Sequence, residues 1–272
     1  MSANIPTYVI NGFLMVLVLG VLLNITLLPL SRRNKKQVCA YVPWGIIDII
    51  AVLLFVIGLQ ILIVIIPSMG IDQVIGVSKE ISGTYVVEIV GISFLVLLLR
   101  RRYGIYWDTL GFKKSGNMAA CIWSIIYYIS AIPWIILMAL ITAFLADKLG
   151  IQLEPQQITK MLLSNQSWCD FILTCFLVMI IAPVGEEIFF RGFVYPVMKR
   201  WMGLGFSAVF NALFFSLLHY NIYAFLPVFV IGIFLVLLYE KTGNIISVML
   251  FHITFNSMSL VLLKVIYGVV IK

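Results

Sequence analysis

The stretch IIDIIAVLLFVIGLQILIVII at residues 46–66 decides the fold class, because apart from one acid, one amide and one glycine it is wholly apolar. A helix of a soluble protein shows polar side chains along one face, and this stretch has no such face. About 20 apolar residues are needed to cross a hydrocarbon core about 30 Å thick. Because lipid offers no partner to backbone N–H and C=O groups, we predict a transmembrane helix here.

The composition of the whole chain supports the same fold class. Of its 272 residues, 63% are hydrophobic and 11% are charged, whereas soluble proteins have about 45–50% apolar and about 25% charged residues. We therefore predict an all-α, polytopic integral membrane protein, a helical bundle with about eight transmembrane helices. The predicted segments are residues 8–30, 41–67, 84–99, 118–146, 168–190, 202–219, 222–239 and 245–270.

Basic residues predict the orientation of this bundle. The net charge is +7, but the lysines and arginines lie beside the apolar segments, which indicates membrane topology rather than a nucleic-acid partner. They gather in the odd-numbered connections, which are therefore predicted to face the cytoplasm. Both termini of this multi-pass protein of the cell membrane are then predicted to lie outside. The predicted fifth connection contains Arg191, Lys199 and Arg200.

Ionisable residues inside the apolar segments are candidates for function, because each costs at least ~2.5 kcal/mol to insert. Asp48 and Glu88 lie in the second and third segments. Near the end of the fifth, Glu187 and Arg191 stand four apart in the favourable order for an ion pair. Glu186 points about 100° away on a helix and has no cation at that spacing. One acid is thus expected to be neutralised and the other to be available as a general base, with a structural charge network as the alternative.

The only two histidines, His219 and His252, complete a possible hydrolytic site. His219 follows Phe215 by four residues, and His252 precedes Asn256 by four, so that an imidazole and a carboxamide share one helical face. A single membrane histidine is more often an interhelical hydrogen-bond partner. Together with the acidic pair, however, these residues are the components of water-mediated acyl transfer. A carboxylate and an imidazole deprotonate a water, and an imidazole and an amide stabilise the oxyanion.

Two other hydrolytic chemistries fit the sequence less well. A serine or cysteine nucleophile needs an adjacent base, and Ser216 and Ser257 lie near the histidines without a Gly-x-Ser-x-Gly setting. Two histidines and Glu186 could bind zinc, but the sequence has no His-Glu-x-x-His motif. We therefore expect no cofactor and no metal, with zinc as the minority alternative.

In these motifs the sequence resembles the CAAX-protease and bacteriocin-processing family, also called the Abi family, of intramembrane glutamate proteases. The family pattern is Glu-Glu-x-x-x-Arg, then Phe-x-x-x-His, then His-x-x-x-Asn or Asp, on separate helices. All three motifs occur here in that order, within roughly residues 168–270. The resemblance implies a metal-independent endopeptidase that cuts a membrane-associated peptide or protein, such as a prenylated CAAX protein or a peptide precursor.

The resemblance also implies a role for each motif residue. The first glutamate and the first histidine activate the water, and the second histidine and the amide form the oxyanion hole. Residues 118–272 are then expected to be the catalytic core, with the motifs in 186–256, and residues 1–117 to be accessory helices. The implied catalytic residues are Glu186, His219, His252 and Asn256, supported by Glu187, Arg191 and Phe215.

The predicted spans place the two histidines at different depths. His219 would lie ~25 Å along its segment and His252 only ~10 Å along its own. For the two to meet, either the turn at residues 220–221 lies inside the membrane or the helix of Glu186 continues past Arg191. Polar backbone at that depth requires a protein-lined or watery cavity, which we expect to open toward the cytoplasm.

Two function classes remain as alternatives to the endopeptidase. The first is a non-proteolytic regulatory or immunity protein of the same family. The second is a small transporter, which also places ionisable groups in the middle of its spans. A transporter is expected to show paired broken segments in two related halves, and the sequence shows no such repeat.

Overall fold

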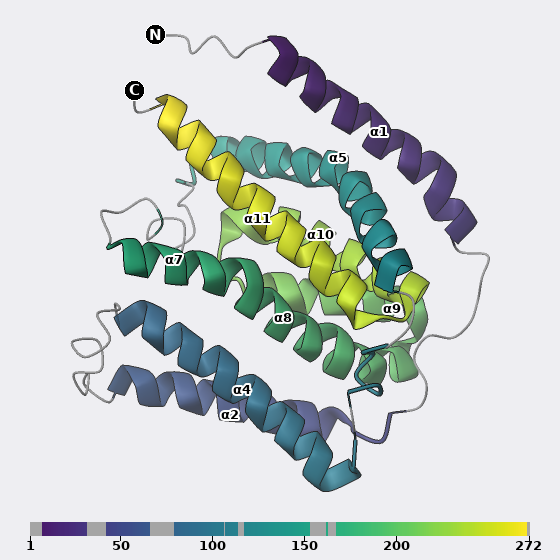
Figure 1. Cartoon of the computed structure of the whole chain (residues 1–272), viewed down its shortest axis with the longest axis vertical. Coiled ribbons are helices and arrows are strands. Elements are labelled where there is room, and N and C mark those ends of the chain that lie inside the picture. The colour runs from purple at the N-terminus through teal and green to yellow at the C-terminus, as the bar shows by residue number, and fades with distance from the viewer. Residues whose placement is uncertain are drawn as a thin grey trace. The chain divides into compact units, whose positions relative to one another are not determined.

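The computed structural model describes residues 7–31, 42–65, 79–105, 107–113, 117–152, 162 and 167–270. Within these residues every regular element is a helix, as Figure 1 shows. Six helical stretches are long and apolar enough to cross a membrane, so the predicted all-α, polytopic membrane fold is confirmed. The helices that stand alone are α1 (Thr7–Ser31), α2 (Ile46–Ile65), α4 (Lys79–Tyr103), α5 (Asn117–Leu149), α10 (Ile222–Thr242) and α11 (Ile245–Val270).

The remaining stretch is one helical run of 50 residues. At 1.5 Å per residue it would extend ~75 Å, more than twice the hydrocarbon core of about 30 Å. It is broken at Gly203, whose φ of 70° and ψ of 179° are accessible chiefly to glycine. Its parts are α7 (Trp168–Phe176), the π-helical segment η1 (Leu177–Ile181), α8 (Ala182–Glu187), the π-helical segment η2 (Ile188–Val194) and α9 (Tyr195–Leu217).

This run corrects the predicted boundary between the fifth and sixth segments. Arg191, Lys199 and Arg200 are helical, and the first of them is 0% exposed. A guanidinium that is paired with an acid inside the protein does not have to end a helix at the membrane surface. The predicted start of the fifth connection at Arg191 is therefore wrong, and the predicted count of eight spans is not confirmed. The helix of Glu186 continues past Arg191, which is one of the two arrangements that the sequence left open.

The chain divides into two compact units, each of which is described by itself. One unit contains α1, α5, α10, α11 and the C-terminal part of α9. The other contains α2, α4, the segments from α7 to η2, and the N-terminal part of α9. The predicted histidine motifs belong to the first unit, and the predicted acidic motif belongs to the second.

In the first unit α5 packs against α1, α10 and α11. The N-cap of helix α10 is Asn221, whose side chain accepts a hydrogen bond of 2.9 Å from the N–H of Ala224. After Thr242 the helix is closed by Gly243, which has a φ of 57° and so forms a left-handed C-terminal cap. The hydroxyl of Ser124 on α5 then donates to the carbonyl of Ser247 at 2.7 Å. These contacts fix the first turn of α11, the helix that carries the second histidine motif.

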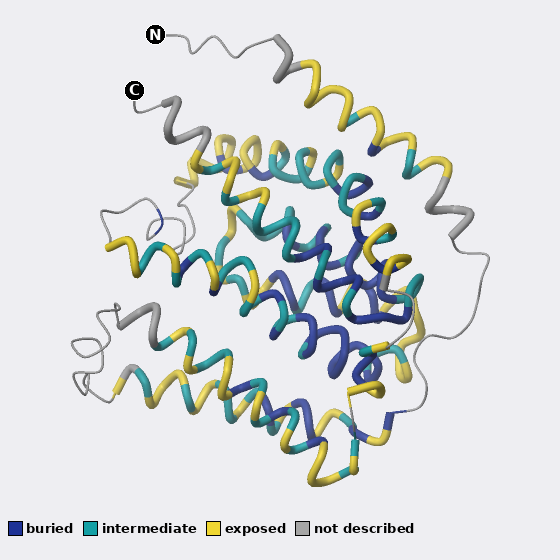
Figure 2. The backbone as a smooth tube through the Cα atoms, viewed as in Figure 1, coloured by how far each residue is buried: buried dark blue, intermediate teal, exposed yellow. Residues whose placement is uncertain are grey.

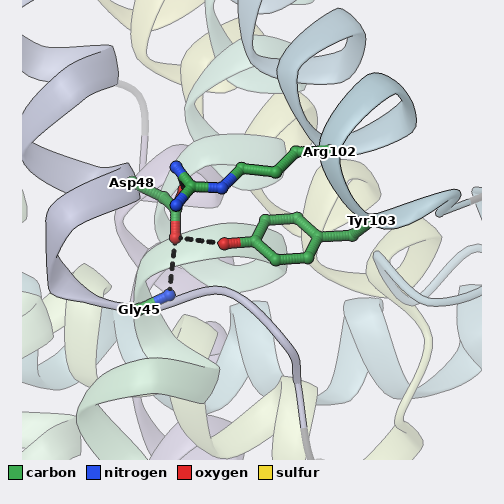
Figure 3. A network of polar contacts seen from close by, with 4 residues as sticks. All are labelled: Gly45, Asp48, Arg102 and Tyr103. Atoms are coloured by element: carbon green, nitrogen blue, oxygen red, sulfur yellow. Dashed lines mark hydrogen bonds and ion pairs between the residues drawn. The ribbon is translucent and has the colours of Figure 1, made fainter.

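In the second unit a hydrogen-bond network joins the start of α2 to the end of α4 (Figure 3). The Asp48 carboxylate accepts from the N–H of Gly45 at 2.9 Å and from the Tyr103 hydroxyl at 2.8 Å. Its other oxygen forms an ion pair of 2.9 Å with Arg102. Asp48 therefore has a structural explanation, because an acid in the first turn caps the helix and stabilises its N-terminus.

Burial differs between the helices in a way that fits a membrane protein. Figure 2 shows exposed residues along most of α1, whereas every residue of η2 except Phe189 is buried. Many exposed side chains are large and apolar, for example Ile47 at 74% and Met118 at 77%. A soluble protein rarely exposes so much apolar surface, so we interpret these faces as lipid-facing.

Candidate active site

The acidic motif lies where α8 passes into η2. Glu187 is the last residue of α8, and Arg191 lies in the π-helical segment that follows. The Arg191 Nη1 donates to Glu187 Oε1 at 3.0 Å, and both side chains are 0% exposed. The ion pair expected from the spacing is therefore present. π-helical turns are rare and are frequent at functional sites, and here one precedes α8 and one follows it.

Glu186 is half-buried, in contrast to its fully buried neighbour Glu187. Its charge acts on the Arg191 guanidinium together with the charge of Glu187. The expectation that Glu186 has no local cation is therefore wrong. The hydrogen bond from Arg191 Nη1 to Glu187 ties that acid to the guanidinium. This arrangement holds one carboxylate in an ion pair and leaves its neighbour more accessible.

The histidine motifs meet around one aromatic ring. Phe215 on α9 is 1% exposed, and its ring centroid lies 4.7 Å from that of His219 and 5.7 Å from that of His252. Both contacts are edge-to-face, which is a favoured geometry for aromatic rings. Phe215 thus contacts the imidazoles of both histidine motifs. Asn256 is half-buried on α11, one helical turn after His252.

A backbone hydrogen bond sets the tautomer of His219. Its Nδ1 lies 2.8 Å from the carbonyl oxygen of Phe215. A carbonyl oxygen only accepts, so Nδ1 carries the proton and Nε2 of the neutral ring carries the lone pair. An imidazole with this tautomer can act as a base or a hydrogen-bond acceptor through Nε2. This is the form that deprotonation of a water requires.

The turn after α9 holds this histidine in place. Tyr220 has a φ of 48°, which is uncommon for a residue with a bulky side chain. Such backbone strain costs of order 1–3 kcal/mol and occurs preferentially at functional sites. The Ser216 hydroxyl donates to the carbonyl of Phe225 at 2.7 Å and so ties the end of α9 to α10. The turn that carries His219 is therefore held beside α10 by this hydrogen bond.

The residues of each predicted motif lie within a single unit of the chain. Glu186, Glu187 and Arg191 come together in one unit, whereas Phe215 and both histidines come together in the other. Within the described residues no cluster of three or more His, Cys, Asp or Glu side chains is arranged to hold a metal ion.

One acidic residue was not assigned to the predicted site although it lies beside it. Glu88 on α4 approaches α8 at Gly185, the residue that precedes Glu186. The sequence marked Glu88 only as an ionisable residue in an apolar segment. Its partner in space could not be read from spacing, because the two helices are far apart along the chain.

The fold and these motifs define a polytopic helical membrane protein with an acidic motif in one unit and the histidine motifs in the other. Residues 168–258 match the family model described as type II CAAX prenyl endopeptidase Rce1-like. The match agrees with the CAAX-protease and bacteriocin-processing family that the motifs of this segment resemble, and that family is one of membrane endopeptidases. The matched residues include every predicted site residue. Neither the curated proteins nor the solved structures give a match to the chain.

Proposed function

We propose that this protein is a metal-independent intramembrane endopeptidase that hydrolyses a peptide bond of a membrane-associated substrate. The observation that carries the proposal is the hydrogen bond from His219 Nδ1 to Phe215, which leaves Nε2 as a base within a segment matching an endopeptidase family. The substrate class is a prenylated CAAX-type protein or a peptide precursor. Such a substrate reaches the protein through the lipid bilayer.

In the proposed reaction Glu186 and His219 remove a proton from a water, whose oxygen attacks the carbonyl carbon of the scissile bond. The negative charge that develops on the carbonyl oxygen is stabilised by His252 and by the amide N–H of Asn256. The C–N bond then breaks as the proton passes to the leaving nitrogen. The products are a carboxylate and an amine, and no other reactant is consumed.

The support residues act on these groups indirectly. Glu187 and Arg191 form a buried ion pair one residue beyond Glu186, which fixes the rotation of that helix. Phe215 separates the two imidazoles. We propose, as the charge pattern predicts, that both termini lie outside and that the site opens toward the cytoplasm.

The test is cleavage of a fluorogenic farnesylated CAAX peptide by the purified protein in detergent, with products identified by mass spectrometry. Glu186→Gln is expected to lower kcat/KM by at least ~10²-fold, because it removes one positioned base. Glu240→Gln on α10 is the matched control, since it makes the same chemical change outside the motifs. It should leave the rate unchanged.

Three results would contradict this assignment in different ways. Near-normal turnover by folded Glu186→Gln protein would mean that another group is the base. Cleavage of neither the farnesylated peptide nor its unprenylated form by wild-type protein would instead favour the regulatory or immunity role. Vesicle-based transport coupled to an ion gradient would favour the transporter.

A further inference from the structure

Exposed basic residues gather at the end of the second unit where α2 begins and α4 ends. The last turn of α4 contains Arg100, Arg101 and Arg102, and all three are exposed. The helix is closed there by Gly104, which has a φ of 63° and whose N–H donates to the Arg100 carbonyl at 3.0 Å. Because the C-terminus of a helix carries partial negative charge, cations are favourable in its last turn. That effect does not by itself explain three consecutive exposed arginines.

A fourth arginine, from α9, joins the same end of the unit. Arg200 is exposed, and its Nη1 donates to the carbonyl of Val42 at 3.2 Å. Six residues after Val42, the Asp48 carboxylate forms its ion pair with Arg102 (Figure 3). The segment at residues 42–48 thus connects the end of α4 to the helical run that carries the acidic motif.

Two exposed tryptophans lie close to these arginines in the chain. Trp201 is 70% exposed, and the guanidinium of Arg200 lies over its ring at 5.6 Å. Trp107 follows α4, is 51% exposed and packs edge-to-face on Phe112 at 5.3 Å. Tryptophan is enriched where a membrane meets water, because its ring is apolar and its N–H is polar. Together the two tryptophans and the four arginines form one basic surface.

The ends of the apolar helices place this basic surface at the level of lipid headgroups. The apolar part of α2 begins at Ile46 and that of α4 ends at Tyr103, and Asp48 joins these two ends. Apolar helices of this length end at the boundary of the hydrocarbon core. The arginines therefore lie where the phosphate groups of lipids lie.

The acid that contacts the basic surface and the acid that follows α4 leave most of its charge unneutralised. Asp48 is 3% exposed and is held by Arg102 and Tyr103. Asp108 is exposed and accepts a hydrogen bond from the N–H of Thr109. Two acids therefore stand against four arginines, and the surface keeps a surplus of positive charge.

We propose that the basic surface binds the headgroup phosphates of anionic phospholipids in the leaflet beside it. The planar guanidinium donates two parallel hydrogen bonds to a phosphate, and an anionic leaflet attracts basic residues near its surface. Because Arg200 belongs to the same helical run as the acidic motif, bound lipid holds that run at a fixed level in the membrane. The proposal goes beyond the peptidase reaction and is tested without it.

Native mass spectrometry of the full chain in mixed micelles tests the choice of lipid. The micelles contain a neutral detergent with either phosphatidylglycerol or phosphatidylcholine, and the lipids retained per protein are counted over a range of lipid fractions. The wild type should retain phosphatidylglycerol in preference, and added salt should weaken this preference. Equal retention of the two lipids overturns the proposal. Displacement of phosphatidylglycerol by an equal concentration of glycerol phosphate or of an acidic peptide also overturns it, because the occupant is then a soluble anion or an acidic protein segment.

Single replacements of the exposed arginines test the location of the site. Arg100→Gln, Arg101→Gln and Arg200→Gln should each weaken phosphatidylglycerol binding about fivefold, the effect of one cation near an anionic leaflet. Arg200→Lys, which keeps the charge, should restore most of the binding. Lys148→Gln is the matched control, since it removes an exposed cation from the last turn of α5, and it should leave the preference unchanged. An equal loss in Lys148→Gln would show a response to net charge alone and would overturn the proposal.

Thermal unfolding in neutral detergent without added lipid checks the folding of each variant. Arg100→Gln and Arg101→Gln should unfold like the wild type, because both side chains are exposed. Arg200→Gln also loses the hydrogen bond to Val42, so the two α4 variants decide the question if this one does not fold. Folded α4 variants that retain phosphatidylglycerol as the wild type does would overturn the proposal.

Discussion

Replacing Arg191 with Met removes the guanidinium from a fully buried site while it keeps an unbranched apolar side chain there. The lost contact is the 3.0 Å ion pair with Glu187, in which both side chains are 0% exposed. Removing one partner of such a pair leaves the other charge buried and typically costs ~3–5 kcal/mol. The stacking of Arg191 near the Phe190 ring at 5.7 Å adds roughly 0.5–2 kcal/mol at most. Since whole proteins are stable by only about 5–15 kcal/mol, the loss is a large part of the total.

Thermal unfolding in detergent, followed by tryptophan fluorescence, measures this cost. For soluble domains of 150–250 residues 1 kcal/mol corresponds to about 2–4 °C, so we expect a decrease in Tm on the order of 10 °C. The double variant Glu187→Gln/Arg191→Met should recover part of it, because no unpaired charge is then left buried. Activity should fall in the single variant as well, since the charge of Glu186 also acts on this guanidinium.

Two outcomes would refute this reasoning. An Arg191→Met protein that unfolds like the wild type but is inactive would assign the arginine a direct role in catalysis. A double variant whose loss of stability equals the sum of the two single losses would show that the pair is not coupled.

Three further predictions concern the metal and two structural contacts. Active protein should contain less than stoichiometric zinc by elemental analysis and should keep its activity after prolonged dialysis against a strong chelator, whereas inactivation with specific rescue by zinc would establish a metalloprotease. Trp44→Phe should lower stability by ~1–3 kcal/mol, because it leaves the buried Phe193 carbonyl without the 2.9 Å bond from Trp44 Nε1. Trp134→Phe, at a 44% exposed position on α5, should leave the melting temperature unchanged. Asp48→Ala should cost about 0.5–2 kcal/mol through the lost cap of α2 and leave the activity per folded molecule unchanged, and a selective loss of turnover would show that Asp48 belongs to the site.

Spacing along a helix was sufficient to predict the contacts that lie within one element. Glu187 and Arg191 pair at 3.0 Å because positions four apart face each other on a helix. The same rule placed His252 and Asn256 on one face of α11. Hydropathy found the spans for a similar reason, since each span needs only its own apolar residues.

The end of the fifth segment could not be predicted in this way. Arg191 looks like the border of a span when each residue is scored by its own cost of transfer into lipid. The structure instead buries it against Glu187, so its charge faces the protein and the helix continues. The two π-helical segments and the break at Gly203 have no periodic signal in the sequence. The approach of Glu88 to Gly185 depends on the packing of two helices that are distant in the chain.

The helices before the matched segment, which the sequence predicts to be accessory, contact the helical run that carries the acidic motif. The Trp44 indole donates to the carbonyl of Phe193 inside η2 and stacks on its ring. The Tyr85 hydroxyl binds Leu173, one turn before η1. Glu88 fills the space that Gly185 leaves open. A π-helical turn is less favourable than an α-helical one and persists where its surroundings hold it. We therefore expect the position of Glu186 to depend on these N-terminal contacts, so that the family motifs alone do not build the site.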